Sequence, residues 1–305
     1  MDQVTVYAPG SASNLGPGFD CLGVAFTGKG DKVSVRRADG GGIRVLSVSD
    51  PRIPTDPDRN TAAIAAAAVC RRAGADVGLE LVVEKGLPLS GGMGGSAASA
   101  VAGAVATAAL LATRFSQIDL LLAAIEAEAV VAGRHADNVA PSLMGGAVLI
   151  GGLDPPLLVP VRVHAGLALV LVTPEYGVET ARARALLPKD VPRATAIAQA
   201  GALAGLVLGL ERGDGDLIRV SMVDRIAEPA RLSLYPGYEA ARGTALETGA
   251  FGVAISGAGP TVLAVASWAG AVSVGQAMVQ AFRRAGIAAV AHAAEIDKAG
   301  ARVVA

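Results

Sequence analysis

A run of glycines placed directly before an alanine-rich segment constrains the fold of this chain more than any other feature. Residues 88–98 read PLSGGMGGSAA, and residues 96–114 are strong helix formers without proline, so a glycine loop opens a helix there. Glycines let backbone N–H groups approach a phosphate without Cβ clashes, and the helix N-terminus adds aligned donors and a positive dipole. The loop therefore predicts an anion site, with an ordinary tight turn capped by Ser96 as the alternative.

Several other classes of protein lose support from motif and composition. The loop carries neither the lysine of the P-loop signature nor the spaced glycines of dinucleotide folds. With 26 Lys and Arg against 27 Asp and Glu, and no basic run, nucleic acid is not an expected partner. The longest apolar stretch, residues 97–112, falls short of the roughly 20 residues of a membrane span, so no membrane partner is expected. Two cysteines and no secretory signal indicate the cytoplasm.

The order of the predicted elements favours an α+β fold over a doubly wound one, because strands and helices are mixed without regular alternation. The predicted strands are 3–8, 32–37, 79–84, 146–150, 167–172, 253–256, 262–266 and 288–292. The predicted helices are 60–73, 96–114, 117–132, 179–187, 193–211, 238–248 and 272–285. Residues 153–160 are rich in proline, so they are expected to interrupt regular structure and to separate domains 1–155 and 156–305.

Two further glycine-rich segments lie far from this loop in the sequence. Residues 9–20 read PGSASNLGPGFD, and residues 256–261 read SGAGPT between two predicted strands. In order and separation the three segments resemble the GHMP kinase superfamily, named for galactokinase, homoserine kinase, mevalonate kinase and phosphomevalonate kinase. Within it, NLGPGFD at 14–20 and HADNVAP at 135–141 resemble the homoserine kinases, and the likeness covers nearly the whole chain.

The resemblance implies a two-domain α+β fold with a ribosomal-protein-S5-like N-terminal domain and a ferredoxin-like C-terminal domain, with ATP and substrate between them. It implies transfer of the ATP γ-phosphate to the hydroxyl of L-homoserine with Mg²⁺, a step of threonine biosynthesis. A homodimer is a further family expectation. One departure is Gly95-Ser96, where the family usually has paired serines, but the second hydroxyl is kept.

The resemblance also assigns nucleotide and metal ligands. The expected phosphate-binding residues are Pro88, Leu89, Ser90, Gly91, Gly92, Met93, Gly94, Gly95, Ser96, Ala97 and Ala98. Ser96 and Glu128 offer hard oxygen ligands suited to Mg²⁺. Glu128 has the family-like spacing to His135, whereas Glu126 is expected on a solvated helix face. Asn60 matches a family position near adenine, but it also begins a predicted helix and is equally an N-cap candidate.

Asp137 and Asn138 are the expected catalytic residues, because a turn after a helix can project polar groups into a cleft. Phosphoryl transfer mostly requires positioning and charge neutralisation. In related mevalonate-type kinases the aspartate matching Asp137 can act as a base towards the substrate hydroxyl. Alternatively, Asn138 orients the hydroxyl and no base is obligatory.

An amino-acid substrate presents an ammonium and a carboxylate, which require an acidic partner and a guanidinium. The resemblance places Asp20 and Asn14 at the ammonium, and Arg184 and Arg231 at the carboxylate. Arg184 lies four residues after Thr180, a helical spacing that puts both on one face. The remaining expected substrate-binding residues are His135, Asn138 and Gly257.

Two other functions fit parts of the sequence. A GHMP kinase for another alcohol, such as a mevalonate-type substrate, would need no partner for an ammonium, so a role for Asp20 at an ammonium discriminates against it. An ATP-binding regulator that kept the fold would need no catalytic groups, and Ser96, Glu128 and Asn138 argue against it.

Overall fold

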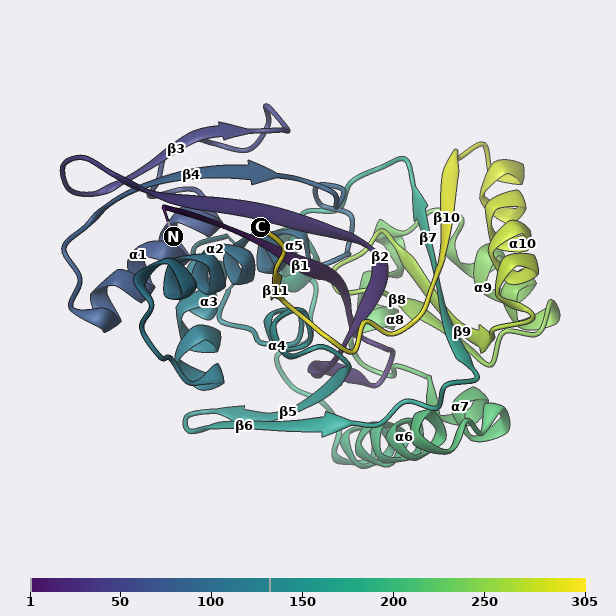
Figure 1. The fold of residues 1–305 in the computed structure, drawn as a ribbon. Coiled ribbons are helices and arrows are strands. Elements are labelled where there is room, and N and C mark those ends of the chain that lie inside the picture. The colour runs from purple at the N-terminus through teal and green to yellow at the C-terminus, as the bar shows by residue number, and fades with distance from the viewer. Residues whose placement is uncertain (1, 132) are drawn as a thin grey trace.

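Two β-sheets organise the chain, and the computed structural model describes residues 2–131 and 133–305 (Figure 1). The first sheet runs β11-β1-β2-β4-β3, with β5 paired to β2 and β6 to β5; the second runs β10-β7-β9-β8. The first contains β1 (Gln3–Asn14), β2 (Gly18–Ala38), β3 (Ile43–Val48), β4 (Gly78–Glu84), β5 (Ala147–Leu153), β6 (Pro156–Val161) and β11 (Arg302–Val303). The second contains β7 (Leu167–Pro174), β8 (Gly252–Ile255), β9 (Val262–Ser267) and β10 (Ala289–Ala294). The predicted α+β class is confirmed.

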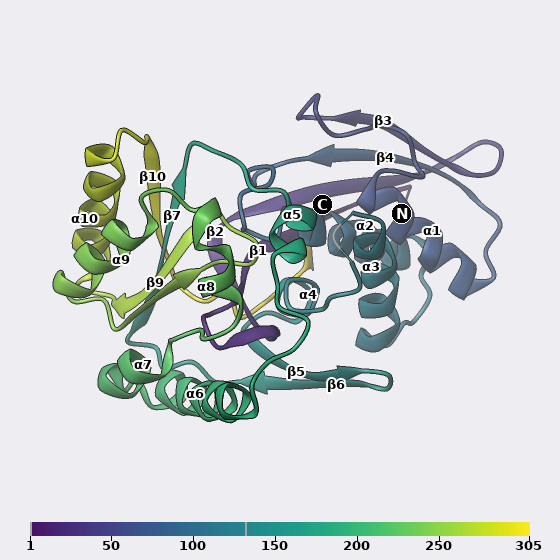
Figure 2. The same cartoon turned by 180° about the vertical axis from the view of Figure 1, so that it is seen from behind.

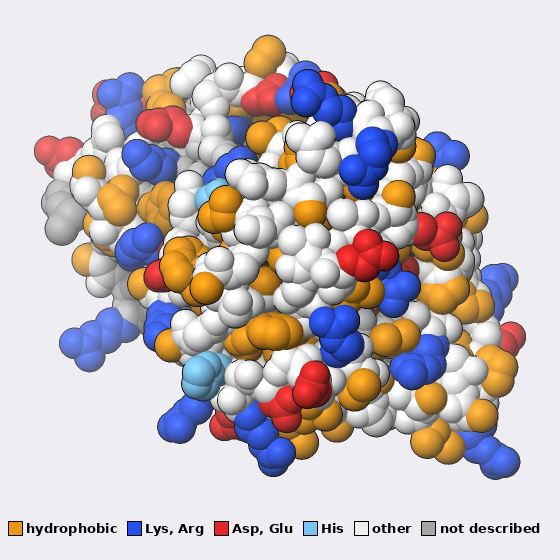
Figure 3. Space-filling model, turned by 90° about the vertical axis from the view of Figure 1, so that its right-hand side faces the viewer, with side chains coloured by type: hydrophobic (Ala, Val, Ile, Leu, Met, Phe, Trp, Pro, Cys, Tyr) orange, Lys and Arg blue, Asp and Glu red, His pale blue; other side chains and the backbone are white. Residues whose placement is uncertain are grey.

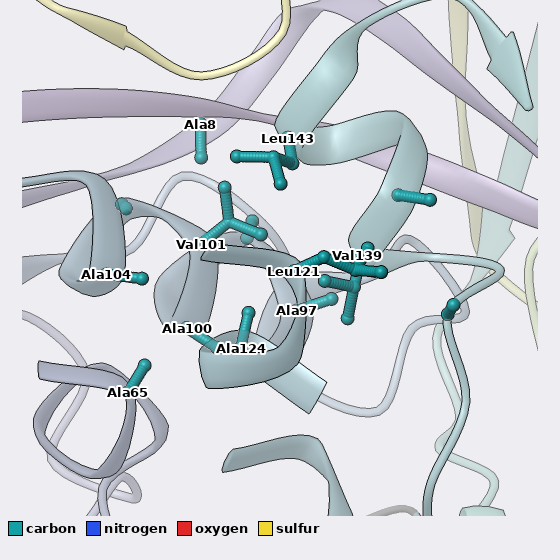
Figure 4. Close-up of a cluster of buried hydrophobic side chains, with 14 of the residues drawn as sticks. Ala8, Ala65, Ala97, Ala100, Val101, Ala104, Leu121, Ala124, Val139 and Leu143 are labelled. Carbon is teal, nitrogen blue, oxygen red and sulfur yellow. The ribbon is translucent and has the colours of Figure 1, made fainter. Parts of the chain in front are cut away.

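Four helices lie on one side of the first sheet: three pack against its strands, and the third in chain order packs against the other three. They are α1 (Thr61–Ala73), α2 (Gly95–Leu111), α3 (Gln117–Val131) and α4 (Val139–Met144). The predicted alanine-rich helix is confirmed as α2, and Figure 4 shows its Ala97 and Ala100 gathered with Ala65 of α1 and Ala124 of α3. Small side chains allow these helices to approach closely, which takes the place of aromatic packing. The predicted end of α3 at Ala132 lies outside the described residues.

Three strands of the second sheet, β7, β8 and β9, are buried on both faces. Side chains alternate between faces along a strand, so Leu169 and Leu171 of β7 join the hydrophobic core that the first sheet forms with its helices. Val170 and Val172 point the other way into a second core. That second core lies under α9 (Tyr238–Glu247) and α10 (Ala271–Arg284). The sheet thus ties the two halves of the chain into one body.

The proline-rich segment does not interrupt regular structure, contrary to expectation. Asp154 and Pro155 form the turn between β5 and β6, and Pro160 lies within β6 opposite Val148 of β5. β6 pairs only with β5 among the described strands, and an edge strand tolerates proline because its outer N–H groups need no partner. The expected division at 155/156 falls at this turn. Because β6 belongs to the first sheet, the chain leaves that sheet only after Val161.

Several elements were not predicted from the sequence. β1 and β2 extend well beyond their predicted cores at 3–8 and 32–37, and β3 has no counterpart in the prediction. The chain also returns to its beginning, because β11 pairs with β1 through Val303 and Val6. The last residues therefore belong to the first sheet and not to the second unit.

One helix within residues 2–131 and 133–305, α6 (Arg193–Arg212), is long and apolar enough to cross a membrane. Its Leu206 and Leu210 are buried in the first core, and it packs along α7 (Gly215–Ser221), so it is a surface helix of the folded body. On the face drawn in Figure 3, basic and acidic side chains are interspersed, and no continuous basic stripe forms there.

We expect Gly103 of α2 to be replaceable only at a cost in stability. A Cβ there would lie 2.4 Å from the carbonyl oxygen of Ala62 in α1, so the helices would have to separate. Gly103→Ala should lower the free energy of unfolding by about 1–3 kcal/mol. Gly201→Ala is the matched control, because Gly201 is also within a helix but has open space around it; it should gain about 0.5–1 kcal/mol. Urea denaturation measures both, and equal effects would contradict the packing argument.

Candidate active site

A cleft of about 550 Å³ is bordered by residues of both sheets and their helices. Its walls include α5 (Thr180–Ala185) and α8 (Ala227–Arg231), which lie in the middle of the molecule in both views (Figure 1, Figure 2). All three glycine-rich segments reach it, through Ser13, Gly94 and Gly257 among others. Residues that are more than 240 positions apart in sequence are thus brought to one cavity.

Three direct hydrogen bonds hold these segments together. Ser256 donates its hydroxyl to the carbonyl of Gly92 at 2.6 Å. The N–H of Gly257 donates to the carbonyl of Ser13 at 3.1 Å, and the N–H of Ser11 donates to the carbonyl of Met93 at 3.1 Å. A Cβ at Gly92 would lie 2.5 Å from the carbonyl oxygen of Ser256, so only glycine permits this approach.

The glycine loop ends in an open helix N-terminus. Gly94 is the N-cap of α2, with φ of 67°, and no side chain caps the helix. The alternative of a turn capped by Ser96 is therefore wrong, since Ser96 lies inside the first turn. The N–H groups of that turn have no partner within the helix, which suits them to bind an anion.

Most of the predicted phosphate-binding residues line the cleft. These are Pro88, Leu89, Ser90, Gly91, Gly92, Gly94, Gly95 and Ser96. Met93, Ala97 and Ala98 do not, because their side chains are buried in the hydrophobic core. For these three residues only the backbone remains available to a ligand.

The expected metal ligands lie together. Glu128 of α3 is buried, accepts a hydrogen bond from Ser96, and has one oxygen, Oε1, without a partner among the described residues. Burial raises the pKa of Glu128 to about 7 against this hydrogen bond, and the charge of Asp137 adds to the rise. Glu126 is on the surface, paired with Arg71 and Arg72, as expected.

These donors fit Mg²⁺. A buried carboxylate oxygen without a partner is costly unless a cation or proton meets it. No group of three or more His, Cys, Asp or Glu within the described part of the chain could hold a metal. Mg²⁺ commonly needs only one or two carboxylates when substrate phosphates supply further oxygens, so Ser96 and Glu128 suffice beside a bound nucleotide.

The two expected catalytic residues are fixed by β1. Asn138 accepts a hydrogen bond from the hydroxyl of Ser11 at 2.9 Å and donates to the hydroxyl of Ser13 at 3.0 Å. Asp137 is buried and is hydrogen-bonded to Ser13. Burial and the charge of Asp20 raise the pKa of Asp137 to about 6, although the hydrogen bond to Ser13 opposes the rise. Both side chains are thus held in one orientation beside the cleft.

Asp20 and Arg184 pair with each other across the cleft. Arg184 Nη2 lies 2.7 Å from Asp20 Oδ1, and Nη1 lies 3.1 Å from Oδ2, a bidentate geometry. His135 Nδ1 lies 3.7 Å from the same carboxylate. Thr180 and Arg184 both line the cleft, as their spacing predicted. The residues expected at opposite ends of a substrate are therefore in direct contact.

Arg231 lies behind this pair. Its side chain is buried and donates from Nε to the carbonyl of Ala183 at 2.8 Å. Its guanidinium is 4.9 Å from the centre of the Phe19 ring, and that of Arg184 is 5.4 Å from the same ring. Phe19 thus orients two cations together, a role that the sequence did not suggest even though Phe19 lies within a recognised motif.

Asn60 and Asn14 use their side chains mainly for structure. Asn60 accepts from the N–H groups of Ala62 and Ala63 as the N-cap of α1, and it donates to the carbonyl of Pro54. Asn14 accepts from the N–H of Asp20 and donates to the carbonyl of Gly257. Both residues still line the cleft, but each has only one N–H left for a ligand.

Strained backbone is concentrated at the cleft. Five described residues other than glycine have φ between 48° and 74°, and three of them, Asn14, Asp20 and Ser90, line the cleft. Such conformations persist only where the surroundings enforce them, and they gather at functional sites. Neither this strain nor the lining of the cleft by Lys85 was predicted from the sequence.

Comparison with known proteins gives consistent matches over the whole chain. Residues 60–146 match the model of the GHMP kinases N terminal domain, and residues 196–285 match that of GHMP kinases C terminal. A homoserine kinase of Arabidopsis thaliana is 42% identical over 99% of this chain and 85% of that protein. One of Natronomonas pharaonis is 38% identical over 97% of this chain and 98% of its own. The crystal structure of homoserine kinase from Cytophaga hutchinsonii superposes with a TM-score of 0.95, at 39% identity, covering 100% of this chain and 98% of that one.

The raised pKa of Asp137 predicts a pH-dependent stability. The folded protein keeps this proton up to about pH 6, whereas the unfolded chain loses it near pH 4, so stability falls as the pH rises between these values. Asp137→Asn has no carboxyl group to titrate at this position. Between pH 4 and pH 7 its free energy of unfolding, relative to that of the wild type, should therefore rise by up to about 3 kcal/mol.

Urea denaturation at pH 4.5 and pH 7.5 measures this difference. Asp190→Asn, at an exposed loop position, controls for the chemical change itself. A difference between Asp137→Asn and wild type that stays constant with pH would contradict the assigned cost of burying the carboxylate.

Proposed function

The chain belongs to the homoserine kinase family of the GHMP kinases, and on that premise we propose how its residues carry out the reaction. It transfers the γ-phosphoryl group of ATP to the side-chain hydroxyl of L-homoserine, giving O-phospho-L-homoserine and ADP in threonine biosynthesis. The observation that supports this most strongly is a cleft with an open helix N-terminus for phosphates and a carboxylate–guanidinium pair for an amino acid.

The triphosphate binds against the N-terminus of α2. The backbone N–H groups between Gly91 and Ser96 bind the negatively charged phosphates. No side chain caps the helix, so none has to be displaced. Ser96 and Glu128 would hold Mg²⁺ beside the phosphate oxygens, and the bound cation supplies further charge neutralisation. Asn60 offers its remaining N–H towards the nucleotide base.

L-Homoserine separates Asp20 from Arg184. Its ammonium takes the Asp20 carboxylate, and its carboxylate takes the guanidinium groups of Arg184 and Arg231. One ion pair is thus exchanged for two, and no buried charge is left without a partner. Thr180, His135 and Gly257 complete the walls around the substrate.

Asn138 and Asp137 act on the hydroxyl. Ser11 and Ser13 fix the Asn138 amide, so it can orient the substrate oxygen in line with the γ-phosphorus. As the new oxygen–phosphorus bond forms, the bond to the departing ADP oxygen breaks, and the hydroxyl proton passes to the Asp137 carboxylate. A carboxylate with a pKa of about 6 is ionised at neutral pH and is a better proton acceptor than an ordinary one.

We propose a homodimer on the family resemblance, and a cytoplasmic location on the chain's two cysteines.

The reaction is tested with purified protein, ATP, Mg²⁺ and a panel of alcohols. L-Homoserine should be turned over best. 3-Aminopropan-1-ol lacks the carboxylate and 4-hydroxybutanoate lacks the ammonium, so each leaves one charge of the site without a partner. Each should show a kcat/KM lower by roughly 100-fold, because an unpaired charge costs about 3 kcal/mol. Preferred turnover of mevalonate or of either analogue would contradict the proposal.

Ser96→Ala tests the metal assignment. Loss of one oxygen ligand should raise the Mg²⁺ concentration for half-maximal activity by about tenfold, a change of about 1.4 kcal/mol. Magnesium is titrated at fixed ATP with saturating homoserine. An unchanged magnesium dependence would show that this hydroxyl does not act as a ligand.

A further inference from the structure

A buried ion pair lies beneath the phosphate loop and has no part in the reaction described above. Asp31 of β2 is fully buried, and the side chain of Lys85, directly after β4, is only 5% exposed. Both come from the sheet, whereas the loop they contact leads into α2. Removing two charges from water is costly, so an ion pair in this position needs a reason beyond stability.

Every hydrogen of the Lys85 ammonium is used within the protein. Lys85 donates to the Asp31 carboxylate, to the carbonyl of Gly95 at 2.7 Å and to the hydroxyl of Ser99 at 2.9 Å. An ammonium has three donors, so none is left for a nucleotide even though Lys85 borders the cleft. Lys85 is therefore placed to hold the loop and not to bind phosphate.

Asp31 holds the opposite end of the loop. Its Oδ1 accepts from the N–H groups of Gly86 and Leu87, at 3.0 and 3.3 Å, directly before the loop begins. Its Oδ2 accepts from the Ser99 hydroxyl at 2.8 Å and from Lys85. One carboxylate thus connects the entry of the loop to its exit at the first two turns of α2.

We propose that Asp31, Lys85 and Ser99 form a buried clamp that fixes both ends of the phosphate loop and so sets the affinity for the phosphates of the nucleotide. The loop itself is glycine-rich and would otherwise sample many conformations. Donors that are held in place before the ligand arrives bind charge more tightly than donors that must first be ordered. The three are positioning residues, and the proposal rests on the proposed function only in taking residues 88–96 as the phosphate site.

Ser99→Ala is the mildest test, because it removes one hydroxyl and leaves the ion pair. Dissociation constants for adenosine, ADP and ATP are measured by competition with a fluorescent ATP analogue. We expect ADP and ATP to bind about tenfold more weakly, with adenosine and the KM for homoserine changed less than twofold. Thr107→Val is the matched control: Thr107 is a buried hydroxyl on the same helix without a hydrogen-bond partner among the described residues. It should leave all three affinities unchanged.

A second variant guards against a trivial loss of folding. The double variant Asp31→Asn with Lys85→Met removes both charges together, so no unpaired charge stays buried. It should weaken the binding of ADP and ATP, but not of adenosine, in the same way. An equal loss for adenosine, or a lower melting temperature with unchanged ATP affinity, would overturn the clamp. Failure of the wild type to phosphorylate homoserine would refute the proposed reaction and would leave these binding measurements interpretable.

Discussion

The structure depends on the contact of three glycine-rich backbones at one point. Ser11 bonds to Met93, Gly257 to Ser13, and Ser256 to Gly92, so each segment holds the other two. A side chain at Gly92 would force two of the segments apart, because its Cβ would lie 2.5 Å from the carbonyl oxygen of Ser256. Because the segments belong to the first sheet, the loop before α2 and the second sheet, the same contacts join the two units. They also place the N-terminus of α2 in the same cleft as the proposed substrate-binding residues Asp20 and Arg184.

The cleft carries electrostatic costs that its ligands would offset. Glu128 and Asp137 are buried carboxyl groups whose pKa values burial raises, and Asp20 and Arg184 neutralise each other. A cation at Glu128 and a zwitterion between Asp20 and Arg184 would satisfy these groups in turn. The strained backbone at Asn14 and Ser90 fits the same pattern, since proteins accept local strain where function requires it.

Local sequence predicted the elements whose signals are local. The α2 helix and the strand at Leu167–Pro174 follow from composition and length, and the motif around Asn138 led to the cleft. Contacts between residues far apart in the sequence could not be predicted in this way. Asp20 and Arg184 are 164 residues apart, and their direct contact was not predicted from the sequence. Their assignment to opposite ends of a substrate stays a prediction. The second strand of the β5–β6 hairpin was missed because proline ordinarily ends a strand, whereas an edge strand accepts it.

A crystal structure with a non-hydrolysable ATP analogue, Mg²⁺ and L-homoserine tests the central claim most directly. We predict the γ-phosphate at the N-terminus of α2, the homoserine hydroxyl beside Asn138, and Asp20 and Arg184 separated by the substrate. A nucleotide bound away from residues 88–96, or an Asp20–Arg184 pair still intact beside bound homoserine, would contradict the account.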